Sequence, residues 1–180
     1  SCVEVTFRTE IAEQALKEIA GKVPEMFLGA GTVLTVEQAK AAAGAGAVFI
    51  LSPGFNPAVV EYCLKEGIRI YPGVCTPSEI ERALAMGLRE LKFFPAEAMG
   101  GVRYLKAVTG PLSMVRFIPT GGVNLENLGG YLKMDCVLAC AGSWIAPTKL
   151  IEEHRFDLIT ERTARSLEVV RLIRGGEQDG

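Results

Sequence analysis

The segment VFILSPGFNPAVVEYCLKEGIRIYPGVCTPSEIERALAMGLRELKFFP, residues 48–95, holds three short apolar runs separated by two stretches with a helical pattern. The runs start at residues 48, 68 and 90. Each helical stretch, at 57–67 and 77–87, opens with proline and closes with glycine. Proline is typical of a first helical position, and glycine is typical of a helix C-terminus. Strands and helices that alternate at a steady period predict right-handed crossovers and a parallel sheet.

The same spacing continues on both sides of this segment. The seven predicted strands are residues 2–7, 26–31, 48–53, 68–73, 90–95, 115–120 and 136–142. Further helical patterns occupy 9–22, 36–47 and 157–175. In the first of these, one face carries Ile11, Ala15, Leu16 and Ile19. The pattern spans the chain and predicts one α/β domain over residues 1–180.

Two α/β architectures compete, an open doubly wound sheet and the (β/α)8 TIM barrel. Charged residues inside two predicted strands, Glu4 and Lys92, favour strands that curve around a shared polar centre. The regular period and the lack of a glycine-rich dinucleotide loop also favour the barrel. A barrel needs eight strands and about 200 residues, whereas this chain has seven predicted strands in 180 residues. We therefore expect a TIM barrel that lacks its first βα unit, at the N-terminus.

The composition excludes several classes of protein. Hydrophobic residues make up 49% of the chain, charged residues make up 22%, and the formal net charge is −2. A nucleic-acid-binding protein usually needs a clustered basic surface, and no run approaches the roughly 18 apolar residues of a membrane span. The opening residues have no signal-peptide layout. These features predict a cytoplasmic globular protein without nucleic-acid or membrane partners.

The cysteines and the histidine give no sign of a metal site. The five cysteines form no CxxC pair, and there is one histidine, His154. The cysteines, which we expect to be reduced and buried, are Cys2, Cys63, Cys75, Cys136 and Cys140.

Alternation along the strands selects the side chains that face inward. Glu4, Thr6 and Arg8 share one face of the first strand, opposite Val3, Val5 and Phe7. In the fifth strand, Lys92 and Phe94 face inward. A lysine enclosed by apolar neighbours needs a partner or a purpose. Two interpretations stay open: a buried Glu4–Lys92 ion pair, or a nucleophilic lysine of lowered pKa with a carboxylate for proton transfer.

Glycine-rich loops follow the last two predicted strands. They are PTGGVN, residues 119–124, and CAGSW, residues 140–144. Glycines let the backbone approach an anion closely, and barrels often bind phosphate at these two loops. Each loop alone is also compatible with a plain turn, but the pair favours a phosphate site.

These residues resemble a known family. The motifs VEVTFRTE, GAGTV, SPG, PGVCTPSE, LKFFPAE, FIPTGGV and AGSW occur in the order of the 2-keto-3-deoxy-6-phosphogluconate (KDPG) and 2-keto-4-hydroxyglutarate (KHG) aldolases. The resemblance extends from Glu4 to about Arg174. It implies a class I, Schiff-base lyase of the Entner–Doudoroff pathway of carbohydrate metabolism. The reaction would yield pyruvate and glyceraldehyde 3-phosphate without a metal or organic cofactor, in a homotrimer.

The resemblance also assigns roles to individual positions. Lys92 resembles the Schiff-base lysine and Glu4 resembles the general acid/base. Arg8 and Thr32 resemble the residues that hold the pyruvyl carboxylate. The remaining substrate-binding positions are Pro53, Phe94, Thr120, Gly121, Gly122 and Ser143, of which the last three resemble the phosphate site.

Two alternatives stay open. One is an aldolase of the same fold for a related keto acid, such as KHG or the phosphogalactonate epimer. The other is an inactive, truncated barrel that serves as a trimeric assembly module. Retention of Glu4, Arg8 and Lys92 weighs against the second alternative, and the absent βα unit weighs for it.

Overall fold

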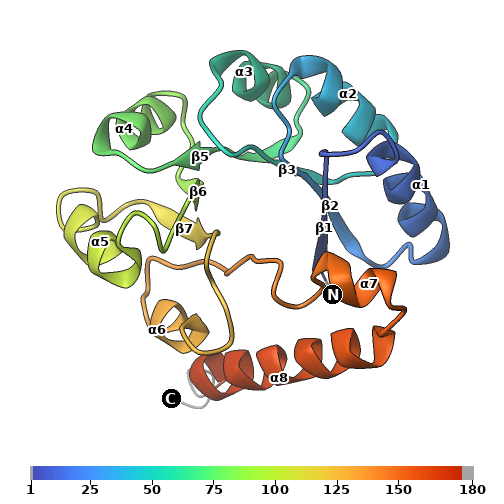
Figure 1. The fold of residues 1–180 in the computed structure, drawn as a ribbon. Helices are drawn as coiled ribbons and strands as arrows, with labels where there is room; N and C mark the ends of the chain where they lie inside the picture. Colours follow the sequence, from blue (N-terminus) through green and yellow to red (C-terminus); the bar gives the residue numbers. More distant parts are fainter. Residues whose placement is uncertain (1, 176–180) are drawn as a thin grey trace. The chain divides into compact units, whose positions relative to one another are not determined.

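The computed structural model describes residues 2–175, which divide into two compact units at Lys92 and Phe93. In the first unit, four parallel strands form a sheet in the order β1-β2-β3-β4 (Figure 1). The elements of this unit are β1 (Cys2–Thr6), α1 (Ala12–Lys22), β2 (Phe27–Gly31), α2 (Val36–Gly44), β3 (Phe49–Leu51), α3 (Pro57–Lys65), β4 (Arg69–Tyr71), β5 (Gly73–Val74), α4 (Pro77–Ala85) and β6 (Glu90–Phe93).

Helices α1, α2 and α3 lie along one side of this sheet and enclose its core with it (Figure 1). The core includes Leu16 of α1 and Leu28 of β2, which are at most 2% exposed. Val3, Val5 and Phe7 pack against it, as the alternation of β1 predicts. Val3, Val5 and Phe7 therefore face the helices. Glu4 lies on the opposite face of β1, away from the helices.

Side-chain caps define the starts of three helices. The hydroxyl of Thr35 accepts from the Gln38 N–H (3.2 Å), and Asn56 Oδ1 accepts from the Ala58 N–H (3.1 Å). Thr76 and Glu79 form a reciprocal capping box at α4. Each such cap is worth about 1 kcal/mol. The loops that follow β2, β3 and β5 are thus short and well defined, and the first two carry the predicted site residues Thr32 and Pro53.

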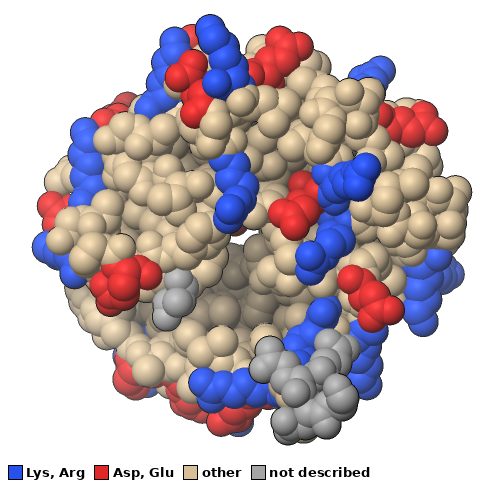
Figure 2. Space-filling model, turned by 180° about the vertical axis from the view of Figure 1, so that it is seen from behind, with Lys and Arg blue, Asp and Glu red and all other residues tan. Residues whose placement is uncertain are grey.

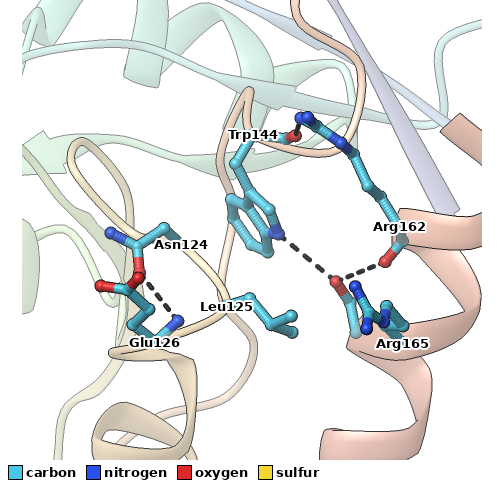
Figure 3. Close-up of a pocket in the computed structure, with 7 residues that line it drawn as sticks. Asn124, Leu125, Glu126, Trp144, Arg162 and Arg165 are labelled. Carbon is cyan, nitrogen blue, oxygen red and sulfur yellow. Dashed lines mark hydrogen bonds between the residues drawn. The ribbon is translucent and has the colours of Figure 1, made fainter. Parts of the chain in front are cut away.

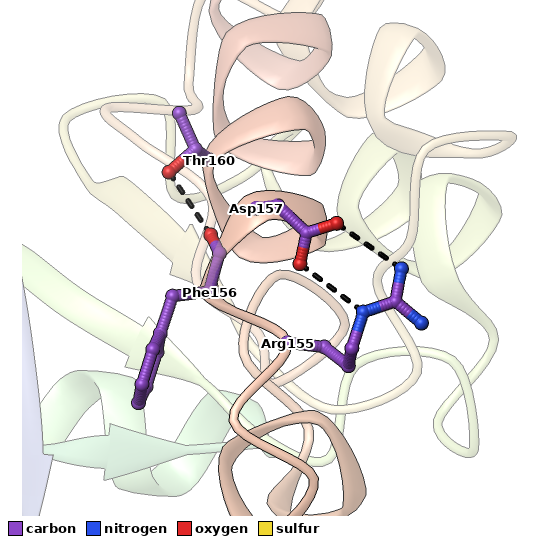
Figure 4. A network of polar contacts seen from close by, with 4 residues as sticks. All are labelled: Arg155, Phe156, Asp157 and Thr160. Carbon is purple, nitrogen blue, oxygen red and sulfur yellow. Dashed lines mark hydrogen bonds and ion pairs between the residues drawn. The ribbon is translucent and has the colours of Figure 1, made fainter.

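The second unit is mostly helical. Its elements are α5 (Gly101–Val108), β7 (Arg116–Pro119), α6 (Leu128–Leu132), α7 (Thr148–Glu152) and α8 (Phe156–Arg174). The long helix α8 packs against both α6 and α7. At its first turn the Arg155 guanidinium donates two hydrogen bonds to Asp157 (3.2 and 3.1 Å), and Thr160 Oγ1 donates to the Phe156 carbonyl (Figure 4). Arg174, at its other end, donates to the Val137 carbonyl (2.7 Å).

The predicted strand 136–142 is wrong as a continuous element. Two isolated parallel bridges replace it, from Val137 to Phe117 and from Ala141 to Thr120. Three steps along the chain from Phe117 to Thr120 face four steps from Val137 to Ala141, so one extra residue interrupts the ladder. The sequence of residues 136–141 has the pattern of a strand. The sequence does not reveal where the hydrogen-bond pairing with the neighbouring strand is interrupted.

Several smaller expectations are also corrected. Ile11 is 67% exposed because it precedes α1, and Ala12 takes its place beside Leu16 in the core. The predicted strand 68–73 is two short strands, β4 and β5, separated by Pro72. Cys63 is buried as expected, whereas Cys2 is exposed, and none of the five cysteines is in a disulfide. His154 is exposed.

The surface carries both signs of charge. On the face drawn in Figure 2, basic and acidic side chains are intermingled. In α1, Glu13 forms an ion pair with Lys17 and Glu18 forms one with Lys22 (2.6 Å each). None of the helices within residues 2–175 has the length and apolar character that crossing a bilayer would require.

Candidate active site

A buried lysine and a carboxylate meet in the first unit. Lys92 lies in β6, where its side chain points away from the face formed by Leu91 and Phe93. Its Nζ is 4.0 Å from Oε1 of Glu4 in β1, and the two side chains are 5% and 20% exposed. The sequence-based prediction that these two residues meet is confirmed by this distance.

The surroundings of Lys92 favour its neutral form. Burial lowers the pKa of the amine from its ordinary value of 10.5, the Glu4 carboxylate raises it in part, and the Arg8 guanidinium lowers it again. The net direction is downward. A neutral amine is the form that attacks a carbonyl carbon, so this site can supply a nucleophile at a lower pH than a solvent-exposed lysine can.

A glycine makes room for the carboxylate. In the parallel pairing of β1 with β2, Thr6 lies opposite Gly31. A Cβ built on Gly31 would coincide with the Glu4 carboxylate, so the absence of a side chain there is what lets Glu4 turn toward Lys92. Gly31 was not among the predicted site residues. Its role depends on the fold, because it is 27 positions away from Glu4 along the chain.

Two more predicted residues follow the same pair of strands. Arg8 is exposed just after β1, and Thr32 comes directly after β2. The Phe7 N–H donates to the Gly31 carbonyl (2.7 Å), which extends the pairing of β1 with β2 to the residues just before Arg8 and Thr32. Thr32 has φ of 58°, a left-handed conformation that β-branched residues rarely adopt. Such strain persists where the surrounding structure imposes it, and it is concentrated at functional sites.

Pro53 lies two residues after the end of β3 and is half-buried. The hydroxyl of Ser52 donates to the Gly54 carbonyl (2.7 Å) and closes the turn. A Cβ on Gly73 would collide with the Pro53 carbonyl, so β5 is in direct contact with the loop that follows β3. The structure thus places Glu4, Arg8, Thr32, Pro53 and Lys92 in the first unit, at or just after its strands.

The remaining predicted residues lie in the second unit, where backbone hydrogen bonds join residues 93–97 to residues 120–121. The Thr120 N–H donates to the Phe93 carbonyl (2.9 Å), and the Ala96 N–H donates to the Thr120 carbonyl (2.8 Å). Gly121 has φ of 97°, and a Cβ there would be 3.3 Å from the Phe94 ring. Phe94, Thr120 and Gly121 are therefore neighbours in space.

Both glycine carbonyls of this turn accept a hydrogen bond. The Gly121 carbonyl accepts from the Glu97 N–H (3.0 Å), and the Gly122 carbonyl accepts from Asn127 Nδ2 (3.0 Å). In a planar trans peptide the N–H of the next residue points away from the carbonyl. The N–H groups of Gly122 and Val123 therefore point away from these two donors, as in an anion-binding backbone turn.

Ser143 is exposed, and its neighbour Trp144 fastens this loop to α8. The indole packs on Gly142, where a Cβ would collide with the ring. Figure 3 shows the indole Nε1 donating to Ser166 Oγ (3.3 Å) and Arg162 donating to the Trp144 carbonyl (2.6 Å). Trp144 is thus a packing residue. A cavity of about 380 Å³ adjoins the indole.

Within residues 2–175, no cluster of three or more histidine, cysteine, aspartate or glutamate side chains has a geometry that could hold a metal ion.

The family model described as "KDPG and KHG aldolase" matches residues 1–162. The chain belongs to the KDPG and KHG aldolase family. The family predicted from the motifs is therefore confirmed.

Curated members of this aldolase family are similar over most of the chain. The 2-dehydro-3-deoxy-phosphogluconate aldolase of Treponema pallidum is 48% identical over 172 residues, which are 96% of this chain and 82% of the relative. The KHG/KDPG aldolase of Escherichia coli is 43% identical over 170 residues, 94% of this chain and 80% of the relative.

A solved member of the family has the same fold. The KDPG aldolase of Legionella pneumophila, crystallised with pyruvate captured as a covalent carbinolamine intermediate, is 40% identical and superposes with a TM-score of 0.88. The likeness covers 93% of this chain and 80% of that chain. The predicted α/β fold class, that of the TIM barrel, is confirmed by this likeness.

Proposed function

We propose that this family member is a class I aldolase that cleaves KDPG to pyruvate and glyceraldehyde 3-phosphate through a Schiff base on Lys92. The main support for this proposal is the buried Lys92 amine, whose pKa is lowered and whose Nζ is 4.0 Å from a carboxylate oxygen of Glu4. An ion pair built only for stability would gain little after desolvation. The covalent pyruvate intermediate of the Legionella pneumophila relative supports the same chemistry.

The proposed reaction begins at the C2 ketone of the six-carbon keto acid. The neutral Lys92 amine adds to C2, and loss of water from the carbinolamine gives a protonated imine. Glu4 passes protons to and from the carbinolamine and then accepts the proton of the C4 hydroxyl. The C3–C4 bond breaks, its electron pair enters the iminium, and glyceraldehyde 3-phosphate leaves. Protonation of the enamine at C3 and hydrolysis of the imine release pyruvate and free Lys92.

The other predicted residues bind the substrate in this proposal. Arg8 and Thr32 would hold the pyruvyl carboxylate, since a guanidinium and a hydroxyl match its two oxygens. Pro53 and Phe94 would flank the imine. Thr120 would lie beside the substrate. Gly121, Gly122 and Ser143 would receive the phosphorylated end, which the orientation of the Gly122 and Val123 amides supports.

The direct test is chemical trapping. The protein is incubated with pyruvate and sodium borohydride, digested, and searched by mass spectrometry for a reduced pyruvyl adduct on the peptide that contains Lys92. An adduct at Lys92 is the expected result. A folded sample that gives none, or one modified at another lysine, would refute the proposal. A lactate dehydrogenase-coupled assay of pyruvate release from KDPG separates an active aldolase from an inactive assembly module.

KHG is a second candidate substrate, because the Escherichia coli relative is named for both keto acids. The same coupled assay, run with KHG, tests it. The homotrimer and the cytoplasmic location stay predictions.

The pH dependence of trapping follows from the lowered pKa of Lys92. The rate of imine formation with pyruvate should rise with pH and level off below 10.5, the ordinary pKa of lysine. The reason is that the buried amine loses its proton earlier than an exposed one. Trapping rates between pH 5 and pH 10, measured beside the small amine Nα-acetyl-lysine, check this. An inflection shared by protein and model amine would contradict it.

Gly31→Ala should reduce activity with little effect on folding. The new methyl group would displace the Glu4 carboxylate, a flexible side chain that can swing away from Lys92. Misplacement of a reacting group by about 1 Å can cost up to about a hundredfold, and we expect a loss of roughly ten- to a hundredfold in kcat. Gly44→Ala in α2, where a Cβ meets no atom within 4 Å, is the matched control. Equal kcat for the two variants would contradict the assigned role of Gly31.

A further inference from the structure

Glu97 touches both glycines of the turn at Gly121 and Gly122. Its N–H donates to the Gly121 carbonyl (3.0 Å). A Cβ built on Gly122 would lie 2.6 Å from the Glu97 Cβ and 2.7 Å from its Cγ. The Glu97 side chain therefore lies directly against the Gly122 α-carbon, and it fills the space that a side chain at Gly122 would take.

The carboxylate of Glu97 is itself fixed from a third element. Its Oε1 accepts a short hydrogen bond from the hydroxyl of Tyr131 in α6. Tyr131 is 0% exposed. Burial and, next, the bond to Glu97 raise the pKa of this phenol well above its ordinary value of 10, so the hydroxyl keeps its proton and acts as a donor. The group that holds the Glu97 carboxylate is therefore the hydroxyl of a fully buried tyrosine, whose ring is fixed by packing.

A further glycine leaves space for this pair. A Cβ on Gly101 would lie 2.8 Å from Glu97 Oε1 and 2.9 Å from the Tyr131 hydroxyl. The first residue of α5 thus lacks a side chain where the two polar groups meet. Tyr131, Glu97 and Gly122 form a continuous chain of contacts from the buried face of α6 to the glycine turn.

We propose that Glu97 is a positioning residue for the phosphate of the substrate: held by Tyr131, it fixes the Gly121–Gly122 turn so that the amides of Gly122 and Val123 stay directed at the anion. This inference rests on the proposed function, which assigns the turn to the phosphate, and adds the residues that orient it. Backbone donors bind an anion well only when they are oriented before it arrives. Loss of Glu97 should therefore weaken binding of the phosphorylated end and spare the imine chemistry at Lys92.

Three variants and two substrates test this. Glu97→Ala removes the contact, Glu97→Gln keeps an oxygen that can accept from Tyr131, and Tyr131→Phe removes the donor while it preserves the ring. For KDPG we expect Glu97→Ala to raise KM about tenfold or more with kcat within about threefold, Tyr131→Phe to act in the same direction, and Glu97→Gln to stay near wild type. For KHG, which carries no phosphate, KM should stay unchanged in all three. Glu168→Ala, exposed on α8, is the control.

A purely structural role gives a different result. Equal losses on KDPG and KHG, or no loss on KDPG in Glu97→Ala and Tyr131→Phe, would overturn the assignment. Binding of inorganic phosphate, followed by isothermal titration calorimetry, keeps the test independent of turnover: Glu97→Ala should bind it about tenfold more weakly than wild type. If the wild-type protein neither traps pyruvate nor cleaves a keto acid, the proposed function fails, whereas this titration still decides on Glu97. If phosphate binds wild type and Glu97→Ala with equal affinity, or binds neither protein, the positioning role of Glu97 is refuted.

Discussion

Lys92→Met is expected to abolish pyruvate release, by on the order of 10⁴-fold or more, and to leave the protein folded. In the proposed mechanism no other group forms the imine, so nothing replaces the lost amine. Methionine is close to lysine in length and has no charge, so it suits a side chain that is 5% exposed. The lactate dehydrogenase-coupled assay measures the loss, and borohydride trapping should give no adduct.

The stability of Lys92→Met distinguishes a catalytic lysine from a structural one. Because burial lowers the pKa of Lys92 in the folded state, the unfolded chain binds more protons at pH values between the lowered value and 10.5. Stability contributed at this position therefore rises as pH rises through that window. At neutral pH the wild type carries the cost of the buried amine, so Lys92→Met should melt at the same temperature or higher, and its advantage should shrink toward pH 10.

The matched control is Lys65→Met, at the exposed end of α3. It should retain full activity and an unchanged pH profile of stability. Residual pyruvate release above about a hundredth of wild type in Lys92→Met would rule out the imine mechanism. A large drop in its melting temperature at neutral pH would instead favour the ion-pair interpretation of Glu4 and Lys92.

Glu4→Gln is the second large effect, with an expected loss of about 10² to 10⁴ in kcat, the range of a general acid/base. Glutamine has the same shape but cannot accept and return a proton at this position. The Glu4 carboxylate also raises the pKa of Lys92, so its removal lowers that pKa further and leaves more neutral amine. Attack on the ketone is therefore not the step that suffers; the proton transfers that follow should be slowed.

One measurement, compared with kcat, separates these steps in Glu4→Gln. Exchange of the pyruvate methyl protons for deuterium, followed by NMR, reports enamine formation and should slow as much as kcat does. Glu10→Gln, exposed beyond the end of β1, is the control and should exchange normally. Normal methyl exchange in Glu4→Gln would remove Glu4 from the acid/base role.

The reacting pair is the part of the site that the sequence reveals best. Two-residue alternation places Val3 and Val5 on the core side of β1, so Glu4 must face the other way. The same rule applies to Lys92 between Leu91 and Phe93. A charge at mid-strand between buried apolar neighbours is rare, and this rarity made both positions visible before any fold was known.

The sequence did not reveal features that depend on the pairing register of strands or on the packing of residues far apart in the chain. The region 136–142 has the alternation of a strand, but one extra residue between the bridges at Val137 and Ala141 interrupts it. The short helix α6 has the sequence LGGYL, whose two glycines give it low helix propensity, so its packing against α8 sustains it.

The roles of Gly31 and Glu97 need coordinates for a similar reason. Gly31 matters because it leaves space for a side chain 27 residues earlier, and Glu97 because Tyr131, 34 residues later, holds its carboxylate. The only sequence signal for Glu97 was its place at the end of LKFFPAE, which the motif included without a role.

The first unit contains Lys92 and Glu4, which make and break the covalent bond in the proposed reaction, and the second contains the amides that the proposal assigns to the phosphate. This division has a consequence for engineering. Changes confined to residues 119–144 could retune the aldehyde that the enzyme accepts, while the pyruvate half of the chemistry stays untouched. A library of variants confined to residues 119–144 would test how many different aldehydes can react with the same Lys92-bound enamine.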